Sequence, residues 1–258
     1  MASKPKDIAD TAVLDRPNPG PIADNSPVLM VGLGRGQTGK SVFARWAIDR
    51  ARNADRPVVA ADGDRSNATL TSYYKDASRP RSADDSDVHA WITDLLEKMA
   101  SDQVSVALDL GGGDRTLEEY AREFPIVEFC EAHSIRLLVA YFIAPNVDSL
   151  APIATLESSG VFRPTNTIAV LNEGLVPYGM APDRAFESVR DHPVFLKVLD
   201  HAQLVIMPKL SCMPTLEQNR ASFFDSFAQS VGPMNAFMTR HWVKQMEVAF
   251  APVQGWLP

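Results

Sequence analysis

Eight consecutive residues near the beginning of the chain carry its clearest chemical pattern. Residues 34–41 read Gly-Arg-Gly-Gln-Thr-Gly-Lys-Ser and fit the phosphate-loop pattern G-x-x-x-x-G-K-[ST]. Glycines let successive backbone N–H groups turn toward a polyphosphate, while the lysine offers a cation and the serine hydroxyl a ligand for Mg²⁺. The residues that we expect to contact bound phosphates are Gly34, Gly36, Gln37, Thr38, Gly39, Lys40, Ser41 and Val42.

The segments on either side of this loop are those that such chemistry requires. The apolar run 28–31 predicts a buried strand before the loop. After it, Phe43, Trp46 and Ala47 recur at helical spacing. A strand that enters the loop and a helix that leaves it would place the phosphates at the positive end of the helix.

Acidic residues follow two further apolar runs. Asp62 and Asp64 end the run 57–61, and Asp109 ends the run 104–108. Because ligands bind at the carboxyl ends of parallel strands, we expect Asp62 and Asp64 to point toward the loop. Ser41, Asp64 and Asp109 are the expected Mg²⁺ ligands, and the glycines 111–113 would leave room for a γ-phosphate and for movement when it is lost.

The rest of the chain alternates apolar runs with longer amphipathic stretches, which is typical of parallel βαβ units. This predicts an α/β fold with a mostly parallel sheet and helices on both faces. The expected strands are 28–31, 57–64, 104–110, 136–144, 167–172 and 204–208. The expected helices after the first are 88–100, 116–133 with a break at Pro125, 148–159, 185–202 interrupted at Pro193, 215–231 and 235–250.

Composition predicts one globular domain. The chain has 258 residues, of which 45% are hydrophobic, enough for one large α/β domain. Residues 1–27 are proline-rich and poor in apolar side chains, so we expect a flexible tail there, a domain over 28–250 and a short tail over 251–258. Neither a signal peptide nor a run of about 18 apolar residues is visible, which favours a cytoplasmic location.

The loop resembles that of the ParA/MinD-type ATPases, whose pattern is K-G-G-x-G-K-[ST]. Residues 35–41 occupy that frame, with Arg35 at the signature lysine and Gln37 at the second glycine. In this family the signature lysine reaches the phosphates of the partner subunit in a nucleotide-sandwich dimer. Arg35 keeps the charge and grips phosphate bidentately, so the resemblance implies a catalytic contact in trans in altered form.

Three later segments extend the resemblance to roughly residues 28–214. Residues 62–69 are similar to the family's switch I segment, with Ser66 where glutamine is usual. This resemblance implies that Asp64 positions or activates the attacking water. Residues 109–113 are similar to the Walker B and switch II segment. Asn172 matches an asparagine that contacts adenine, and Pro208 matches the proline that begins the loop over the base.

The resemblance implies a slow ATP-dependent switch. Lys40, Asp64 and Arg35 would be its catalytic residues, and ATP and Mg²⁺ its cofactors. ATP is favoured over GTP because residues 172–175, Asn-Glu-Gly-Leu, lack the acidic residue that pairs with guanine. An ATP-dependent homodimer and a protein partner, either an activator or a cargo adaptor, are expected. In the way its phosphate loop departs from the family pattern, the chain resembles the plasmid-encoded TraL-like and StbB-like members. That resemblance implies a role in plasmid partition, positioning or conjugative transfer.

Two other functions fit the same loop. A metabolic phosphate-loop enzyme, such as a small-molecule kinase or a dethiobiotin-synthetase-like ligase, would need a polar substrate pocket near residues 110–116 and 145–149. A protein that binds nucleotide without hydrolysing it is the other alternative, because Arg35, Gln37 and Ser66 replace the family's usual residues.

Charge and apolar spacing also bear on possible partners at the surface. The net charge of −7 does not favour DNA, although a local basic patch would permit it. Met238, Trp242, Met246 and Phe250 recur at helical steps near the end of the chain. We expect this face to pack on the domain or on a second subunit rather than on a membrane.

Overall fold

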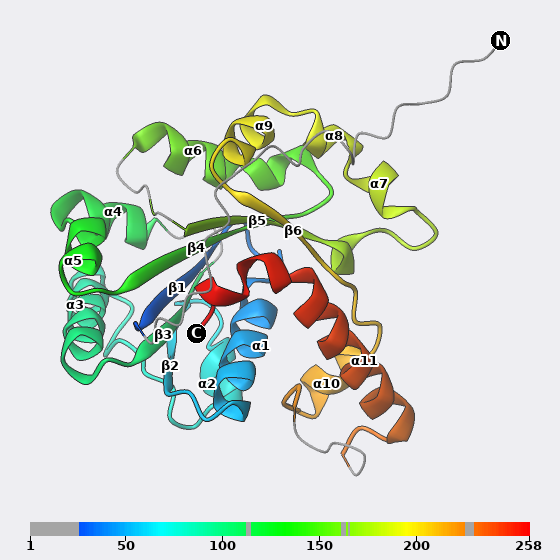
Figure 1. Ribbon diagram of the computed structural model, residues 1–258, viewed down its shortest axis with the longest axis horizontal. Helices are drawn as coiled ribbons and strands as arrows, with labels where there is room; N and C mark the ends of the chain where they lie inside the picture. The colour runs from blue at the N-terminus through cyan, green and yellow to red at the C-terminus, as the bar shows by residue number, and fades with distance from the viewer. Residues whose placement is uncertain (1–25, 112–114, 161–163, 165, 225–229) are drawn as a thin grey trace.

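Six parallel strands form the centre of the protein. The computed structural model describes residues 26–111, 115–160, 164, 166–224 and 230–258. The strand order is β2-β3-β1-β4-β5-β6, and each neighbouring pair is parallel (Figure 1). The strands are β1 Val28–Leu33, β2 Val58–Gly63, β3 Ser105–Leu110, β4 Arg136–Ile143, β5 Asn166–Asn172 and β6 Gln203–Met207. All six predicted strands and the α/β fold class are confirmed.

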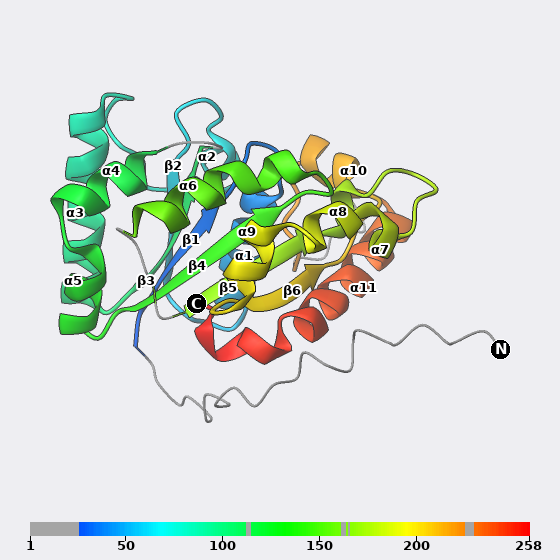
Figure 2. The same cartoon turned by 90° about the horizontal axis from the view of Figure 1, so that it is seen from above.

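Helices cover both faces of this sheet (Figures 1 and 2). Along each strand alternate side chains enter different cores: Leu29 and Val31 of β1 pack on one face, and Val28 and Met30 on the other. The first face is covered by α3 Asp85–Asp102, α4 Thr116–Glu123, α5 Ile126–Ala132, α6 Ala151–Ser159, α7 Pro182–Ala185, α8 Glu187–Arg190 and α9 Pro193–Leu199. The second is covered by α1 Lys40–Asn53, α2 Thr69–Tyr73, α10 Met213–Gln218 and α11 Pro233–Ala249.

Helix α1 lies between the sheet and the end of the chain. Phe43 contacts Phe142 of β4 on one side, with ring centroids 5.4 Å apart. Its ring also stacks on Phe250 at 5.1 Å, and Trp46 contacts Phe250 at 5.0 Å. Apolar contacts on two sides explain why α1 is buried over most of its surface. They fix the helix whose first residue is Lys40.

The C-terminal helix packs on the domain, as its apolar spacing predicts. Trp242, Met246 and Phe250 are buried, and Met238 packs against the same core. Residues 251–258, which we expected to form a tail, instead continue as the 3₁₀ helix η5 Ala251–Trp256. Val253 and Leu257 are buried because they join the core beside α1.

The expected helix over 215–231 is wrong in its extent. Helix α10 ends at Gln218, and Arg220 adopts a left-handed backbone conformation with φ of 48° that stops the helix. Residues 225–229 lie outside the described part, as do residues 1–25 of the expected N-terminal tail and residues 112–114 of the expected glycine loop. The break at Pro125 is confirmed, because α4 and α5 lie on either side of it.

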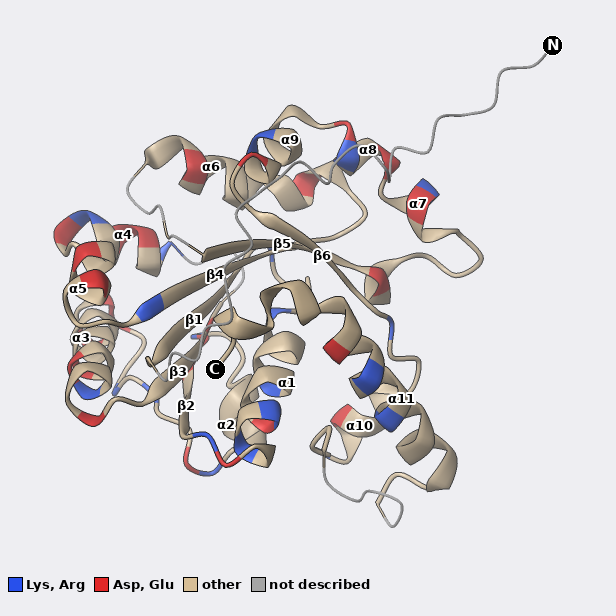
Figure 3. Cartoon of the chain, in the orientation of Figure 1, with Lys and Arg blue, Asp and Glu red and all other residues tan. Residues whose placement is uncertain are grey.

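Charged side chains are spread over many elements (Figure 3). Lys and Arg occur on α1, α3, α9 and α11 rather than on one element. Across the described ranges, no helix combines the length and the apolar character that a membrane span requires.

Candidate functional site

The loop between β1 and α1 has a backbone that glycine permits. Gly34 has φ of 139°, and a Cβ atom there would lie 2.6 Å from the carbonyl oxygen of Phe142. Gly39 has φ of 103°, and a Cβ atom there would lie 2.4 Å from Nδ2 of Asn172. Both positions therefore exclude larger residues on two grounds, backbone conformation and space.

The side chain of Lys40 folds back onto this loop. Its Nζ donates to the carbonyl oxygens of Gly34 and Arg35, at 3.2 and 3.0 Å. The hydroxyl of Thr38 donates to the same Arg35 oxygen at 2.8 Å. Burial lowers the pKa of Lys40, and the negative charges of Asp109 and Asp64 partly oppose that shift. The loop thus holds an ammonium group beside two acidic residues.

Two buried aspartates lie side by side behind the loop. Asp62 of β2 pairs in register with Asp109 of β3, and both are buried. Asp109 pairs on its other side with Gly32, and a Cβ atom on Gly32 would lie 3.3 Å from Cβ of Lys40. The strand order therefore brings Asp109 close to the base of the Lys40 side chain.

Asp109 is poised to bind a cation. Burial raises its pKa to about 6, while a hydrogen bond from Ser41 and the charge of Lys40 act in the opposite direction. Oδ2 of Asp109 and Oδ1 of Asp62 are buried and have no hydrogen-bond partner. An unpartnered carboxylate oxygen next to a serine hydroxyl is a hard donor of the kind that Mg²⁺ prefers, so Asp109 and Ser41 fit the expected ion.

The raised pKa of Asp109 has a consequence for stability. Its carboxyl group binds a proton more readily in the folded chain, with a pKa of about 6, than in the unfolded chain, with the ordinary value of 3.8. Asp109 therefore contributes a loss of stability as pH rises from about 4 to about 6. We expect Asp109→Asn to stabilise the nucleotide-free protein by roughly 3 kcal/mol at pH 8 and by roughly 1 kcal/mol at pH 4.5. Urea unfolding at both pH values checks this, and an equal effect at the two would contradict it.

Asp62 does not play the part expected of it. Its Oδ2 accepts hydrogen bonds from the backbone N–H and the hydroxyl of Thr71, each at 2.8 Å. The carboxylate thus holds α2 against the sheet, and Asp62 does not line the cavity beside the loop. Asp64 does line it, and its Oδ1 accepts from the N–H groups of Ser66 and Asn67 at 2.7 and 2.9 Å.

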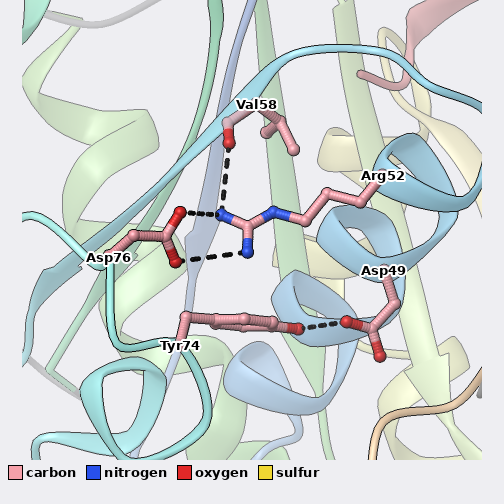
Figure 4. A network of polar contacts seen from close by, with 5 residues as sticks. All are labelled: Asp49, Arg52, Val58, Tyr74 and Asp76. Atoms are coloured by element: carbon pink, nitrogen blue, oxygen red, sulfur yellow. Dashed lines mark hydrogen bonds and ion pairs between the residues drawn. The ribbon is translucent and has the colours of Figure 1, made fainter.

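The far end of the segment 62–74 is fastened to α1 (Figure 4). The hydroxyl of Tyr74 donates to Asp49 at 2.6 Å, and the guanidinium of Arg52 lies 4.9 Å from the centre of the Tyr74 ring. Arg52 also pairs with Asp76 at 2.8 Å. Because Asp62 holds the start of this segment and Tyr74 its end, residues 64–68 form a loop that is tethered on both sides.

The side chain of Arg35 forms an ion pair with a residue outside the phosphate loop. Its guanidinium lies 3.5 Å from Oδ2 of Asp148, which belongs to the 3₁₀ helix η2 Val147–Leu150. Both side chains are largely exposed, at 58% and 77%. An exposed pair at this distance is weak and leaves Arg35 accessible from solvent.

A single cavity of about 1120 Å³ gathers most of the predicted site residues. Gly34, Thr38 and Asp109 do not line it; they shape the loop or lie behind it. The predicted residues that line it are Arg35, Gly36, Gln37, Gly39, Lys40, Ser41, Val42, Asp64, Asn172 and Pro208.

One part of the cavity wall lies far from any motif in the sequence. It is formed mainly by apolar side chains of β6, α10 and α11 and of the loop between β6 and α10. Sequence reasoning missed these residues as ligand contacts. The apolar ones have the type and spacing of ordinary core residues, and Glu217 has those of an exposed helix residue. Trp242 was expected only to pack, and it does pack, donating to the Pro208 carbonyl oxygen at 2.8 Å. The missed residues are Leu175, Met207, Leu210, Met213, Glu217 and Trp242.

Asn172 supports the phosphate loop from this side. Its Nδ2 donates to the carbonyl oxygen of Thr38 at 2.9 Å, and its Oδ1 accepts from the N–H of Gly174 at 2.8 Å. Its expected contact with adenine stays a prediction.

Comparison with known proteins finds similar structures at low sequence identity. MinD in the MinC:MinD cell division protein complex of Aquifex aeolicus is 13% identical, with a TM-score of 0.48, covering 86% of this chain and 96% of that chain. FtsY from Mycoplasma mycoides is 15% identical, with a TM-score of 0.42, covering 70% of this chain and 59% of that chain. FtsY from Elizabethkingia anophelis in complex with GDP is 14% identical, with a TM-score of 0.45, covering 76% of this chain and 59% of that chain.

No protein-family model matches the chain, and no curated protein matches it either. The parallel sheet and the loop after β1 define a phosphate-loop fold, the class in which this loop binds nucleotides. The fold resembles those of MinD and FtsY.

Proposed function

We propose that this protein is an ATP-binding and slowly ATP-hydrolysing dimerisation switch of the ParA/MinD type. One observation carries the proposal: the phosphate loop, Lys40, Ser41 and Asp64 line one cavity, and Asp109 lies directly behind them. That cavity continues into a mainly apolar part that suits a nucleoside.

Each residue has a task that its position supports. Lys40 would leave its loop carbonyls to contact the β- and γ-phosphates, for which its ammonium group is already at the right end of α1. Ser41 and Asp109 would hold Mg²⁺, which neutralises charge on the phosphates. Asp64 would orient the attacking water from the tethered loop 64–68.

Hydrolysis would work as a switch through that loop. A γ-phosphate contacting residues near Asp64 and Gly111 would order them, and its loss would release them. We place the dimer interface over the cavity mouth, where Arg35 is exposed. The cellular role that we propose is plasmid partition, positioning or conjugative transfer, with an activator or cargo adaptor as protein partner.

We expect Arg35→Ala to weaken ATP-dependent dimerisation at least 10-fold. The ATP dissociation constant of the monomer should change less than about 3-fold, because the weak ion pair of Arg35 with Asp148 contributes little to the shape of the loop. Light scattering across a concentration series measures the first effect and titration calorimetry the second. Arg240→Ala removes an exposed arginine from α11 and serves as the control. Equal loss of binding and dimerisation in Arg35→Ala would count against a contact in trans.

The metabolic-enzyme alternative needs a polar substrate pocket near residues 110–116. A second cavity of about 270 Å³ does lie there, against Gly34 and Gly111. Its other walls are mainly apolar, including Leu117, Ile153 and Leu156. The ion pair of Arg115 and Glu118 adds charged groups to these walls. We prefer the switch because Lys40, Ser41 and Asp64 line the larger cavity instead.

A further inference from the structure

Few side chains in the nucleoside part of the cavity can form hydrogen bonds. Among the described residues that line it beyond the phosphate loop and the segment 64–69, Asn172, Glu217 and Trp242 carry a polar side-chain group. The remaining side chains there are apolar. Among the described residues of this part of the wall, these three are therefore the candidates for a side-chain hydrogen bond to the nucleoside.

Two of the three are engaged in holding the cavity wall. Asn172 is 5% exposed and uses both its amide nitrogen and its amide oxygen on backbone groups of Thr38 and Gly174. Trp242 has one polar hydrogen, and the carbonyl oxygen of Pro208 accepts it. Trp242 would have to break or share that hydrogen bond in order to contact a ligand. Asn172 keeps a second amide N–H, but its amide is held in place by these two bonds.

Glu217 is exposed on a helix that is firmly held. It lies on α10, whose neighbouring residue Leu216 is fully buried. The turn after the helix is fixed by Arg45, which donates to the carbonyl oxygen of Ala221 at 3.0 Å and lies over the Tyr73 ring at 3.5 Å. Arg45 of α1 and Tyr73 of α2 are close enough to Glu217 to interact with it electrostatically. A carboxylate is thus presented to the cavity from a rigid support.

A carboxylate accepts hydrogen bonds and has none to donate, so its partner on the nucleoside must be a donor. We propose that Glu217 determines base specificity by accepting a hydrogen bond from the exocyclic amino group of a purine. This inference rests on the proposed function, in which that group is the 6-amino group of adenine. The 6-oxo group of hypoxanthine would face the carboxylate with a second acceptor and be rejected.

The test compares ATP, GTP and ITP, because hypoxanthine lacks any exocyclic amino group. Wild type should bind ATP at least 10-fold more tightly than ITP, the value of one charged hydrogen bond. In Glu217→Gln the ratio should fall below about 3-fold, because an amide can donate to the 6-oxo group as well as accept from the 6-amino group. Glu173→Gln removes a carboxylate next to Gly174 that does not line the cavity and should keep the wild-type ratio. Thermal unfolding of both variants confirms that they are folded.

The outcomes separate this inference from the proposed function. An ATP to ITP ratio that is the same in Glu217→Gln and wild type overturns the role of Glu217 and leaves the ATP switch intact. A wild type that prefers GTP, with a GTP to ITP ratio that collapses in Glu217→Gln, supports the role of Glu217 and overturns the choice of ATP. If Glu217→Gln weakens ATP and ITP equally but spares 2′-deoxyATP, the carboxylate reads the ribose and the inference is wrong. If wild type binds none of the triphosphates, both fail.

Discussion

Lys40→Ala should lower the affinity for ATP at least 100-fold. The ammonium group lies at the start of α1, among carbonyl oxygens of a loop whose glycine backbone suits a polyphosphate. Removing it takes away a charge-assisted contact with the β- and γ-phosphates and leaves the negative charges of Asp109 and Asp64 unopposed beside them. Titration calorimetry with ATP in the presence of Mg²⁺ gives the ATP dissociation constants of wild type and of Lys40→Ala.

The control for this variant is Lys209→Ala. Lys209 is exposed and follows Pro208 at the cavity wall, but its side chain does not line the cavity. Its removal changes the net charge by the same amount, so any general electrostatic effect on ATP appears in both variants. ATP affinity in Lys40→Ala within about 3-fold of wild type would defeat the phosphate-loop assignment.

Asp64→Ala should lower the rate of ATP hydrolysis at least 100-fold while leaving ATP affinity within a few-fold of wild type. A residue that orients or activates water contributes to the transition state rather than to ground-state binding. The rate is measured as phosphate release at saturating ATP, and the affinity by calorimetry.

Asp64→Asn separates chemistry from structure at the same position. An asparagine oxygen accepts hydrogen bonds from Ser66 and Asn67 as the carboxylate does, so the turn is kept while the charge is lost. Loss of hydrolysis in both variants supports the catalytic role. If Asp64→Asn hydrolyses ATP at the wild-type rate, the role of Asp64 is to shape the loop. If Asp64→Ala keeps both the wild-type hydrolysis rate and the wild-type ATP affinity, the alternative of a nucleotide-binding protein that does not use Asp64 is favoured.

The fold was accessible from the sequence because its signals are local and periodic. Strands buried on both faces read as continuous apolar runs, and the glycines of the phosphate loop occupy positions that geometry enforces. Gly34 and Gly39 confirm this directly, since neither has room for a Cβ atom. The register that pairs Asp62 with Asp109 also follows from strand order once both residues end neighbouring strands.

What the sequence did not reveal depends on contacts between distant elements. Asp62 ends its strand as Asp109 does, yet Thr71 binds its carboxylate and α2 covers it. The left-handed turn at Arg220 shortened a helix whose apolar spacing continued beyond it. Glu217 and Trp242 line the cavity only because α10 and α11 fold back over α1, which no local pattern predicts.

The mass of the protein in solution tests the central claim most directly. Light scattering of wild type and Asp64→Ala would be recorded without nucleotide, with ADP and Mg²⁺, and with ATP and Mg²⁺. We predict a monomer in the first two conditions and a dimer with ATP, longer-lived in Asp64→Ala because hydrolysis no longer ends the ATP state. A mass that is the same in all three conditions, in a protein that binds ATP, would contradict the switch.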